Sequence, residues 1–375
     1  MATQNVNYQC PCCTGPLHYS GTSERLECDY CGSSFSVEEI KALYSGKEES
    51  AQAASAAAAQ AEAAAQAAGE NENAEYFESE PQYDADLKVY SCPSCGAELV
   101  FDATTAATSC PYCGNPTIIP GQYNGDFRPD YVIPFKLDRE TAIASLKNFY
   151  KDKKLLPKAF SNENHIEEIK GVYVPFWLID GSAVFDMDYE GTKVSSMRGP
   201  REIVTFTDYY DVRRTGALPF SRIPVDASSK MPDAHMDSIE PYDYSALKPF
   251  STAYLPGFMA DKYDLSVDEC MDRVKVRAVN TTESLVDGDA ASGGYATCVR
   301  RGGNIDVKRT GYKQALLPVW LLSTTWKGNR YLFAMNGQTG KFIGDLPVDN
   351  GRYWATLAKI AVPMAAILSL LFWFL

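Results

Sequence analysis

Apolar, β-branched and aromatic residues fill short runs after Gly171, a pattern that predicts β-strands. Three such runs occupy residues 172–179, 183–189 and 203–212. Each is too short and too rich in β-branched residues to favour a helix. We therefore expect the region after Gly171 to be rich in β-structure.

Two further runs, 317–326 and 330–336, lie on either side of the tripeptide 327–329, which is Lys-Gly-Asn. A short turn of this kind between apolar runs predicts a β-hairpin. The turn at 337–340 then leads to a last short run at 341–343. The sequence thus predicts an antiparallel meander, and we expect the sheet of this region to be antiparallel.

Capping residues and helical spacing predict several helices. Ser36 and Glu39 form a capping box, so a helix is expected to begin at Val37, and Ser266 begins a second box ahead of a helix. Asp138 can cap a helix over 139–151, and a further short helix is expected near 162–169. Together with the strands, these elements define an α+β domain.

The segment 355–375 is almost entirely apolar, with Lys359 as its only charge. A helix of this length spans ~30 Å, the thickness of a bilayer core. Basic residues lie only at its N-terminal side, and aromatic residues lie near both ends. The sequence predicts a tail-anchored protein of the cell membrane, with a single transmembrane helix over 353–375 and the N-terminal domains in the cytoplasm. The alternative is a buried C-terminal helix, which Pro363 disfavours.

Composition divides the rest of the chain. The 375 residues are 45% hydrophobic, enough for several domains. Residues 47–88 are rich in Ala and then acidic, which is typical of a linker, although an acidic docking peptide around Tyr76 is an alternative. The expected domains are a zinc ribbon with a short helix (1–46), the linker (47–88), a second ribbon (89–120), the α+β domain (121–352) and the transmembrane helix (353–375).

The net charge of −13 is concentrated in the first third of the chain. Residues 1–46 hold two basic and five acidic residues, and residues 47–88 hold two basic and ten acidic ones. Nucleic-acid binders normally present a basic face, so nucleic acid is not an expected partner. The N-terminus shows no secretory signal, and eleven cysteines without one indicate a reducing compartment.

Two sets of four cysteines share one spacing and are related by a shift of 82 residues. Two C-x2-C turns about fifteen residues apart suit a zinc ion, which takes four thiolates in a tetrahedron. The extra Cys12 corresponds to Ser94 and is expected to be a bystander. We predict two structural Zn²⁺ ions in rubredoxin-like β-knuckles. Their ligands are Cys10, Cys13, Cys28 and Cys31 in the first ribbon, and Cys92, Cys95, Cys110 and Cys113 in the second.

Signatures of catalysis are missing from the sequence. The three histidines match no metal-binding pattern, and the glycine-rich stretches match no P-loop. Closed four-cysteine sites leave no position for a substrate. No small-molecule substrate is evident, and we expect no enzyme. An unrecognised enzyme in 121–352 would need a polar cleft lined by Asp186, Asp188 or Asp287.

The paired ribbons are accompanied by three further motifs, at 240–244, 254–258 and 317–321. With them, the chain resembles bacterial TFIIB-type zinc-ribbon membrane proteins. Members are often labelled as relatives of the primosomal helicase, but this chain has no helicase motif. The resemblance covers most of the chain outside the linker. It implies an adapter for phage-shock-type or SPFH-like (flotillin-like) membrane-stress proteins.

Two functional hypotheses follow from these features. The first is a membrane-anchored zinc-ribbon adapter that docks cytoplasmic or membrane-associated proteins. The alternative is a nucleic-acid-binding ribbon protein, in which ribbon aromatics stack on bases. Those aromatics are Tyr8, Tyr30, Phe35, Tyr90, Phe101 and Tyr112. The missing basic charge favours the adapter.

Overall fold

A computed structural model describes residues 8–45, 87–91, 98–102, 104–110, 116–118, 128–151, 153–157, 160, 169–200 and 202–374. Within these ranges, side chains are not described at 87–102, 109, 116–118, 366, 370–371 and 374. The chain forms two compact units: unit 1 comprises Met1–Val174, Lys230–Lys262 and Leu316–Leu375, and unit 2 comprises Pro175–Ser229 and Tyr263–Ala315. This division crosses the segment 121–352.

The first cysteine segment folds as a small antiparallel sheet in unit 1. Its strands are β1 (His18–Ser20), β2 (Arg25–Glu27) and β3 (Ser34–Phe35), in the order β1-β2-β3. A helical segment at 37–45 follows. The predicted capping box is confirmed, because Glu39 N–H donates to Ser36 Oγ at 3.1 Å and Ser36 N–H donates to Glu39 Oε2 at 2.6 Å.

The second cysteine segment contributes strands to unit 1. β4 (Leu87–Ser91) pairs with β5 (Glu98–Asp102), and β6 (Thr105–Ser109) pairs with β7 (Pro116–Ile118). β6 also pairs with β12 (Met259–Asp261), which joins it to the large sheet.

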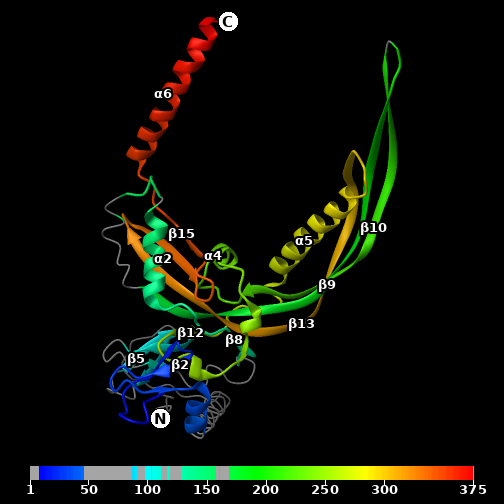
Figure 1. Ribbon diagram of the computed structural model, residues 1–375. Helices are drawn as coiled ribbons and strands as arrows, with labels where there is room; N and C mark the ends of the chain where they lie inside the picture. Colours follow the sequence, from blue (N-terminus) through cyan, green and yellow to red (C-terminus); the bar gives the residue numbers. More distant parts are fainter. Residues whose placement is uncertain are drawn as a thin grey trace, which may run out of the picture. The chain divides into compact units, whose positions relative to one another are not determined.

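The large sheet has ten strands in the described chain, in the order β11-β8-β13-β9-β12-β6-β7, with β10 on β9 and β14 and β15 beyond β13 (Figure 1). Its remaining strands are β8 (Tyr131–Val132), β9 (Lys170–Arg198), β10 (Ile203–Asp226), β11 (Lys248–Pro249), β13 (Thr297–Trp326), β14 (Asn329–Asn336) and β15 (Phe342–Gly344). The predicted meander is confirmed: β13, β14 and β15 pair antiparallel. Lys327 and Gly328 turn with φ of 49° and 81°, as a tight hairpin requires.

The sheet is mixed rather than antiparallel throughout, so that part of the predicted fold class is wrong. β12 runs parallel to β9, with Met259 opposite Val172. Parallel neighbours need a crossover connection. Sixty residues, 199–258, lie between the end of β9 and the start of β12, whereas the sequence signals concern neighbours joined by short turns.

Helices and short 3-10 turns complete unit 1: α2 (Arg139–Lys151), α4 (Asp233–Ser238), η3 (Tyr244–Ala246), η4 (Thr252–Tyr254) and α6 (Asn350–Phe374). The helix predicted over 139–151 is confirmed with those bounds, and Asp138 Oδ1 accepts from Thr141 N–H at 2.8 Å. The helix expected near 162–169 lies almost wholly outside the described residues.

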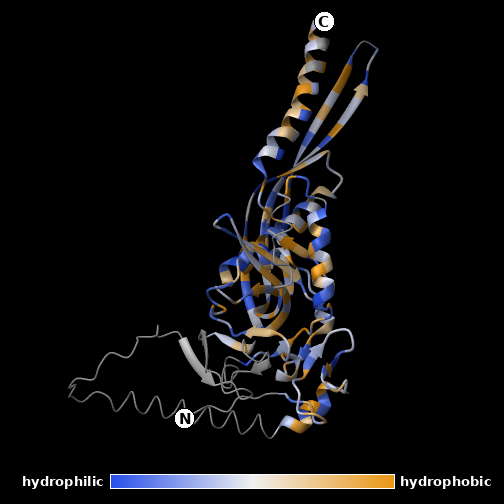
Figure 2. Ribbon diagram, turned by 90° about the vertical axis from the view of Figure 1, so that its left-hand side faces the viewer, coloured by the Kyte–Doolittle hydropathy of each residue, from blue (hydrophilic) through white to orange (hydrophobic). Residues whose placement is uncertain are grey.

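The predicted transmembrane helix over 353–375 is wrong. Among the described residues, no helix is long and apolar enough to cross a membrane. Helix α6 contains Arg352, Lys359 and Pro363, and its residues range from hydrophilic to hydrophobic (Figure 2). The single-pass, tail-anchored location, its cytoplasmic orientation and the membrane as a partner rested on that helix and are corrected with it.

The core of unit 1 centres on Phe135. Its ring stacks on Phe258 at 4.0 Å between centroids and meets Tyr173 and Trp320 edge-on at 5.0 and 5.1 Å. Phe135, Tyr173 and Trp320 are buried, and their aromatic contacts add to the free energy of burial. Gly171 permits this packing, because a Cβ there would lie 2.5 Å from the Phe258 ring.

Unit 2 is a long hairpin of β9 and β10, with part of β13 and helix α5 (Met271–Ala291), which lies along the strands (Figure 1). Met187 and Tyr189 pack with Val286 and Ala290 of α5 in one buried cluster. The two strands predicted at 172–179 and 183–189 are one continuous strand, because Gly181 stays in the sheet. A Cβ at Gly181 would lie 2.3 Å from Lys308 O, so glycine serves close packing here rather than a turn.

Candidate metal centre and a neighbouring pocket

The four cysteines predicted for the first ribbon come together. One sulfur atom from each of Cys10, Cys13, Cys28 and Cys31 lies within 4.8 Å of the others. The Cys10–Cys31 and Cys13–Cys28 sulfur pairs are both 3.5 Å apart. Four thiolates ~2.3 Å from a tetrahedral zinc ion would lie about 3.8 Å apart, so the donor set fits such an ion. The cluster could therefore hold a metal ion.

The two knuckles of this cluster have the same backbone geometry. Thr14 N–H donates to Cys10 O at 2.8 Å, and Gly32 N–H donates to Cys28 O at 2.9 Å. Both donors have positive φ, 60° for Thr14 and 71° for Gly32. Thr14 thus takes a left-handed conformation that glycine, which stands at the equivalent position of the other knuckle, adopts more easily.

Local hydrogen bonds favour a thiolate at Cys31. The Ser33 side chain and backbone hydrogen-bond its sulfur and lower the pKa of Cys31 to about 6. At Cys13 the Gly15 backbone N–H lowers the pKa, but Cys31, Cys28 and burial outweigh it and raise the pKa to about 12. Metal ligands must be deprotonated, so metal binding at this cluster would release protons.

The predicted exclusion of Cys12 agrees with the geometry, because Cys12 is exposed and does not belong to the cluster. Of the four ligands predicted for the second site, only Cys110 is among the described residues, and its side chain is buried. Cys92, Cys95 and Cys113 lie outside the described residues, so the second ion stays a prediction.

The first ribbon is built into the core of unit 1. Leu17, Leu26 and Ile40 are fully buried in the same cluster as Phe250 and Leu255. Polar contacts fix the same junction: Tyr8 Oη to Thr252 Oγ1 at 2.6 Å, Tyr19 N–H to Pro256 O at 2.9 Å, and Lys248 Nζ to Glu24 Oε2 at 2.8 Å. The ribbon therefore shares hydrophobic packing with the body of unit 1, which the sequence did not indicate.

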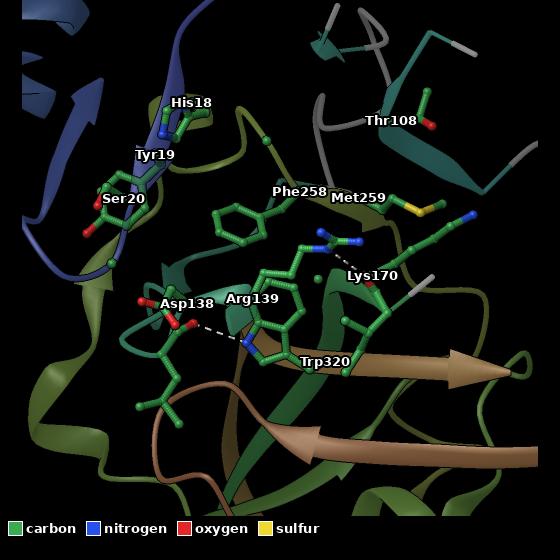
Figure 3. Close-up of a pocket in the computed structure, with 15 residues that line it drawn as sticks. His18, Tyr19, Ser20, Thr108, Asp138, Arg139, Lys170, Phe258, Met259 and Trp320 are labelled. Carbon is green, nitrogen blue, oxygen red and sulfur yellow. Dashed lines mark hydrogen bonds between the residues drawn. The ribbon is translucent and has the colours of Figure 1, made fainter. Parts of the chain in front are cut away.

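A pocket of about 530 Å³ opens between β1 of the ribbon, the start of α2 and the start of β9 (Figure 3). Its wall includes Trp320 and Phe258, and Trp320 Nε1–H donates to Leu137 O at 3.1 Å. Arg139 and Lys170 also line it, as does His18. The pocket could not be predicted from the sequence, because its lining comes from six separate stretches of chain.

Two of the three histidines lie beside carboxylates. His18 Nδ1 lies 3.5 Å from Asp29, and His235 Nε2 lies 3.2 Å from Asp345. His165 lies outside the described residues.

The acids proposed for a catalytic cleft are paired in unit 2. Arg213 lies against Asp186 and Asp188, and Asp287 accepts from Tyr189 Oη at 2.8 Å and from Arg300 at 2.9 Å. None of these three acids lines the pocket.

The fold and the site define a protein in which a four-cysteine ribbon is integrated into a β-rich body. The chain is 34% identical over 244 residues to the uncharacterized protein YdjG of Bacillus subtilis (strain 168), and the match covers 65% of this chain and 71% of YdjG. The chain belongs to the same family as YdjG. No family model and no solved structure matches the chain.

Proposed function

We propose that this protein is a zinc-ribbon adapter that docks protein partners. The observation that carries the proposal is the end of the β9–β10 hairpin, residues 193–198 and 203–210, whose described side chains are all exposed. Met197, Phe206 and Tyr209 are exposed to 67%, 50% and 69%. Met197 pairs with the exposed Val204, on the same face of the hairpin as Phe206, whereas Tyr209 lies on the opposite face. Exposed apolar side chains of this size are typical of protein interaction sites.

The edge of the hairpin supports docking as well. In the described chain β10 pairs with β9 alone, so its other edge presents unpaired backbone groups. An exposed edge can accept a strand from a partner, with main-chain hydrogen bonds supplying affinity. The partner we propose is a protein that contributes an extended segment and apolar side chains. The resemblance to TFIIB-type ribbon proteins adds phage-shock-type and SPFH-like proteins as the partner class.

The role proposed for zinc in this adapter is structural. Four thiolates close the coordination sphere, which leaves no position for a reacting molecule. A closed ion at the edge of the core of unit 1, where Cys10 and Cys28 are buried and Cys13 and Cys31 are exposed, would stabilise that unit. An adapter needs no catalytic group, and the proposal is for a protein that is not an enzyme.

Nucleic-acid binding is supported less well. Of the ribbon aromatics that were candidates for base stacking, Tyr8 is buried, Phe35 is half-buried and packs on the core, and Tyr30 is exposed. Tyr90, Phe101 and Tyr112 have no described side chain. One exposed ring on a ribbon with net negative charge gives little basis for stacking or phosphate contacts.

Site-specific photo-crosslinking tests the adapter. A crosslinking amino acid at Phe206 or Tyr209 is expected to capture a stoichiometric protein partner, identified by mass spectrometry. The purified partner should bind the chain, and Phe206→Ser/Tyr209→Ser should weaken that binding at least tenfold. Leu285, equally exposed on α5, provides the matched crosslinking position and the control variant Leu285→Ser. Equal capture at all three positions, or binding unchanged by the double substitution, would refute docking at the hairpin.

Metal analysis tests the two proposed zinc ions. The full chain should carry two zinc ions, and one ion should remain after Cys10→Ser/Cys13→Ser or Cys92→Ser/Cys95→Ser, because each pair removes half of one ligand set. Cys12→Ser is the control and should retain both ions. One ion in the unaltered chain would rule out the second site, and a different metal at full occupancy would rule out zinc.

A further inference from the structure

Helix α6 presents a large apolar surface to solvent. Every described side chain of α6 from Tyr353 onward is exposed. The large apolar side chains among them range from 42% exposed at Leu357 to 86% exposed at Trp373. The first turn is attached to the rest of unit 1, where Arg352 Nη1–H donates to Leu156 O at 2.6 Å. Apolar surface of this extent is unfavourable in water, so we expect another chain to cover α6.

The apolar residues of α6 follow a heptad repeat. Large apolar side chains occupy both core positions of the repeat, a and d, from Tyr353 onward. The residues at these positions are, in chain order, Tyr353, Leu357, Ile360, Met364, Ile367, Leu371 and Phe374. Their spacing alternates between four and three residues. This is the pattern by which helices pack against one another along one shared seam.

The positions away from this seam carry the charges of the helix. Arg352 and Lys359 both fall at position c, on the outer side of a coiled coil. Up to Ser369, positions b, c and f hold one large apolar residue, Val362, and otherwise Gly, Ala, Ser or a basic residue. Pro363 falls at g, outside the a and d positions, and α6 continues through it. Identical helices can therefore pack in parallel without bringing like charges together in the seam.

The kinds of residue in the seam indicate more than two helices. In parallel coiled coils, Leu at a with Ile at d favours three or four helices over two. In α6, Leu357 at a precedes Ile360 at d, and Met364, which is also unbranched at Cβ, precedes Ile367. Apolar residues fill position e as well, beside the seam, where burial increases as helices are added. They are Trp354, Ala361 and Leu368.

We propose that α6 associates with α6 of further copies of this chain in a parallel bundle of three or four helices. The core of the bundle consists of successive layers of the a and d side chains, and Lys359 lies on its outer surface. This surface is separate from the hairpin, and the assembly does not depend on docking there.

Sedimentation equilibrium of the full chain tests the assembly. The expected mass is three or four times that of one chain. Ile360→Lys places a charge at d, where each copy would bury it beside identical charges, and should give monomers. Val362→Lys adds the same charge at f and should leave the mass unchanged, although Val362 is exposed to 66% in the single chain and Ile360 to 58%. A monomeric unaltered chain, or equal effects of the two substitutions, would overturn the proposal and leave α6 to a different partner.

A further variant tests the packing within the seam. Leu357→Ile/Ile360→Leu/Met364→Ile/Ile367→Leu exchanges the residue types of positions a and d and keeps the surface apolar. Because β-branched residues at a with Leu at d favour two helices, the mass should fall to that of a dimer. Non-specific association of apolar helices would not respond to this exchange. A mass that the exchange leaves unchanged, or an unaltered chain that is already dimeric, would refute the proposed bundle.

Discussion

A buried ion pair in unit 2 shows how strongly a single residue can affect the stability of the fold. Asp226, at the end of β10, is 0% exposed, and Arg273 Nη1 lies 2.8 Å from its Oδ1. A charge taken out of water is costly, so the carboxylate depends on its partner. Neither residue stands out in the sequence, because an Asp at the end of a strand and an Arg in a helix are both common on protein surfaces.

Arg273→Met is therefore expected to destabilise the protein by ~3–5 kcal/mol, since it removes the positive charge that lies 2.8 Å from a buried carboxylate. Chemical denaturation followed by α-helical circular dichroism measures this loss. Arg301→Met is the matched control. Its pair with Glu190 is largely exposed, and the expected loss is below ~1 kcal/mol. Similar losses for the two variants would mean that the Asp226 pair is solvated.

At the scale of elements, local chemistry fixes where helices and turns begin. Asp138 and the box at Ser36 start helices where the sequence predicts. The box at Ser266 forms too, with Glu269 N–H donating to Ser266 Oγ at 3.4 Å and Ser266 N–H donating to Glu269 at 2.7 Å. The residues that follow it make a turn, and α5 begins only at Met271. A capping box thus predicts a turn reliably, but tertiary packing decides the first residue of the helix.

The same box predicts a pH effect. Hydrogen bonds from the Ser266 side chain and backbone lower the pKa of Glu269 below its usual value of 4.5. A lowered pKa stabilises the fold above pH 4.5, and the contribution is lost as the pH falls through the folded-state pKa.

Glu269→Gln is expected to lower the melting temperature slightly at pH 7, and the difference from the unaltered chain should shrink as the pH falls well below 4.5. Ser266→Ala removes the bond that caps Glu269 N–H, at a cost of ~1 kcal/mol, and serves as the comparison. A melting-temperature difference that stays constant across this pH range would show that the carboxylate charge makes no contribution.

Long-range pairing could not be deduced from the sequence for a physical reason. The run at 172–179 correctly predicts a strand, but nothing in it shows that Val172 lies beside Met259. Likewise the cysteine spacing correctly groups Cys10, Cys13, Cys28 and Cys31, whereas the pocket is defined by residues as distant as His18 and Trp320. Periodicity and spacing report neighbours within an element or across one turn. Contacts across the fold depend on packing among many elements.

For the whole molecule, loss of the metal ion should affect more than the ribbon, because the ribbon shares its hydrophobic core with the rest of unit 1. Leu17 and Leu26 pack in one cluster with Phe250 and Leu255, so loosening the ribbon exposes both sides of that contact. A ribbon joined only by a tether would unfold alone. Unit 2 has its own buried clusters around Trp177 and Met187, which contain no ribbon residue.

Hydrogen exchange measured after treatment with a chelator checks this coupling. Exchange should rise at 8–45 and also at 250–258, while α5 keeps its protection because its packing lies within unit 2. The Cys10→Ser/Cys13→Ser variant should show the same pattern, and Cys12→Ser should not. A rise confined to 8–45 would show that the ribbon is independent of the core. A rise throughout α5 would show that the two units do not unfold separately.

The integration of the ribbon also has a consequence for the order of events during synthesis. Leu17 leaves the ribosome more than two hundred residues before Phe250, its neighbour in the same core. At ~5–20 residues per second, that interval is on the order of 10–50 s. During this time the two cysteine knuckles must hold their geometry without the packing that later covers them. A bound ion would keep the nascent ribbon in its final conformation until the remaining residues of its core have been synthesised.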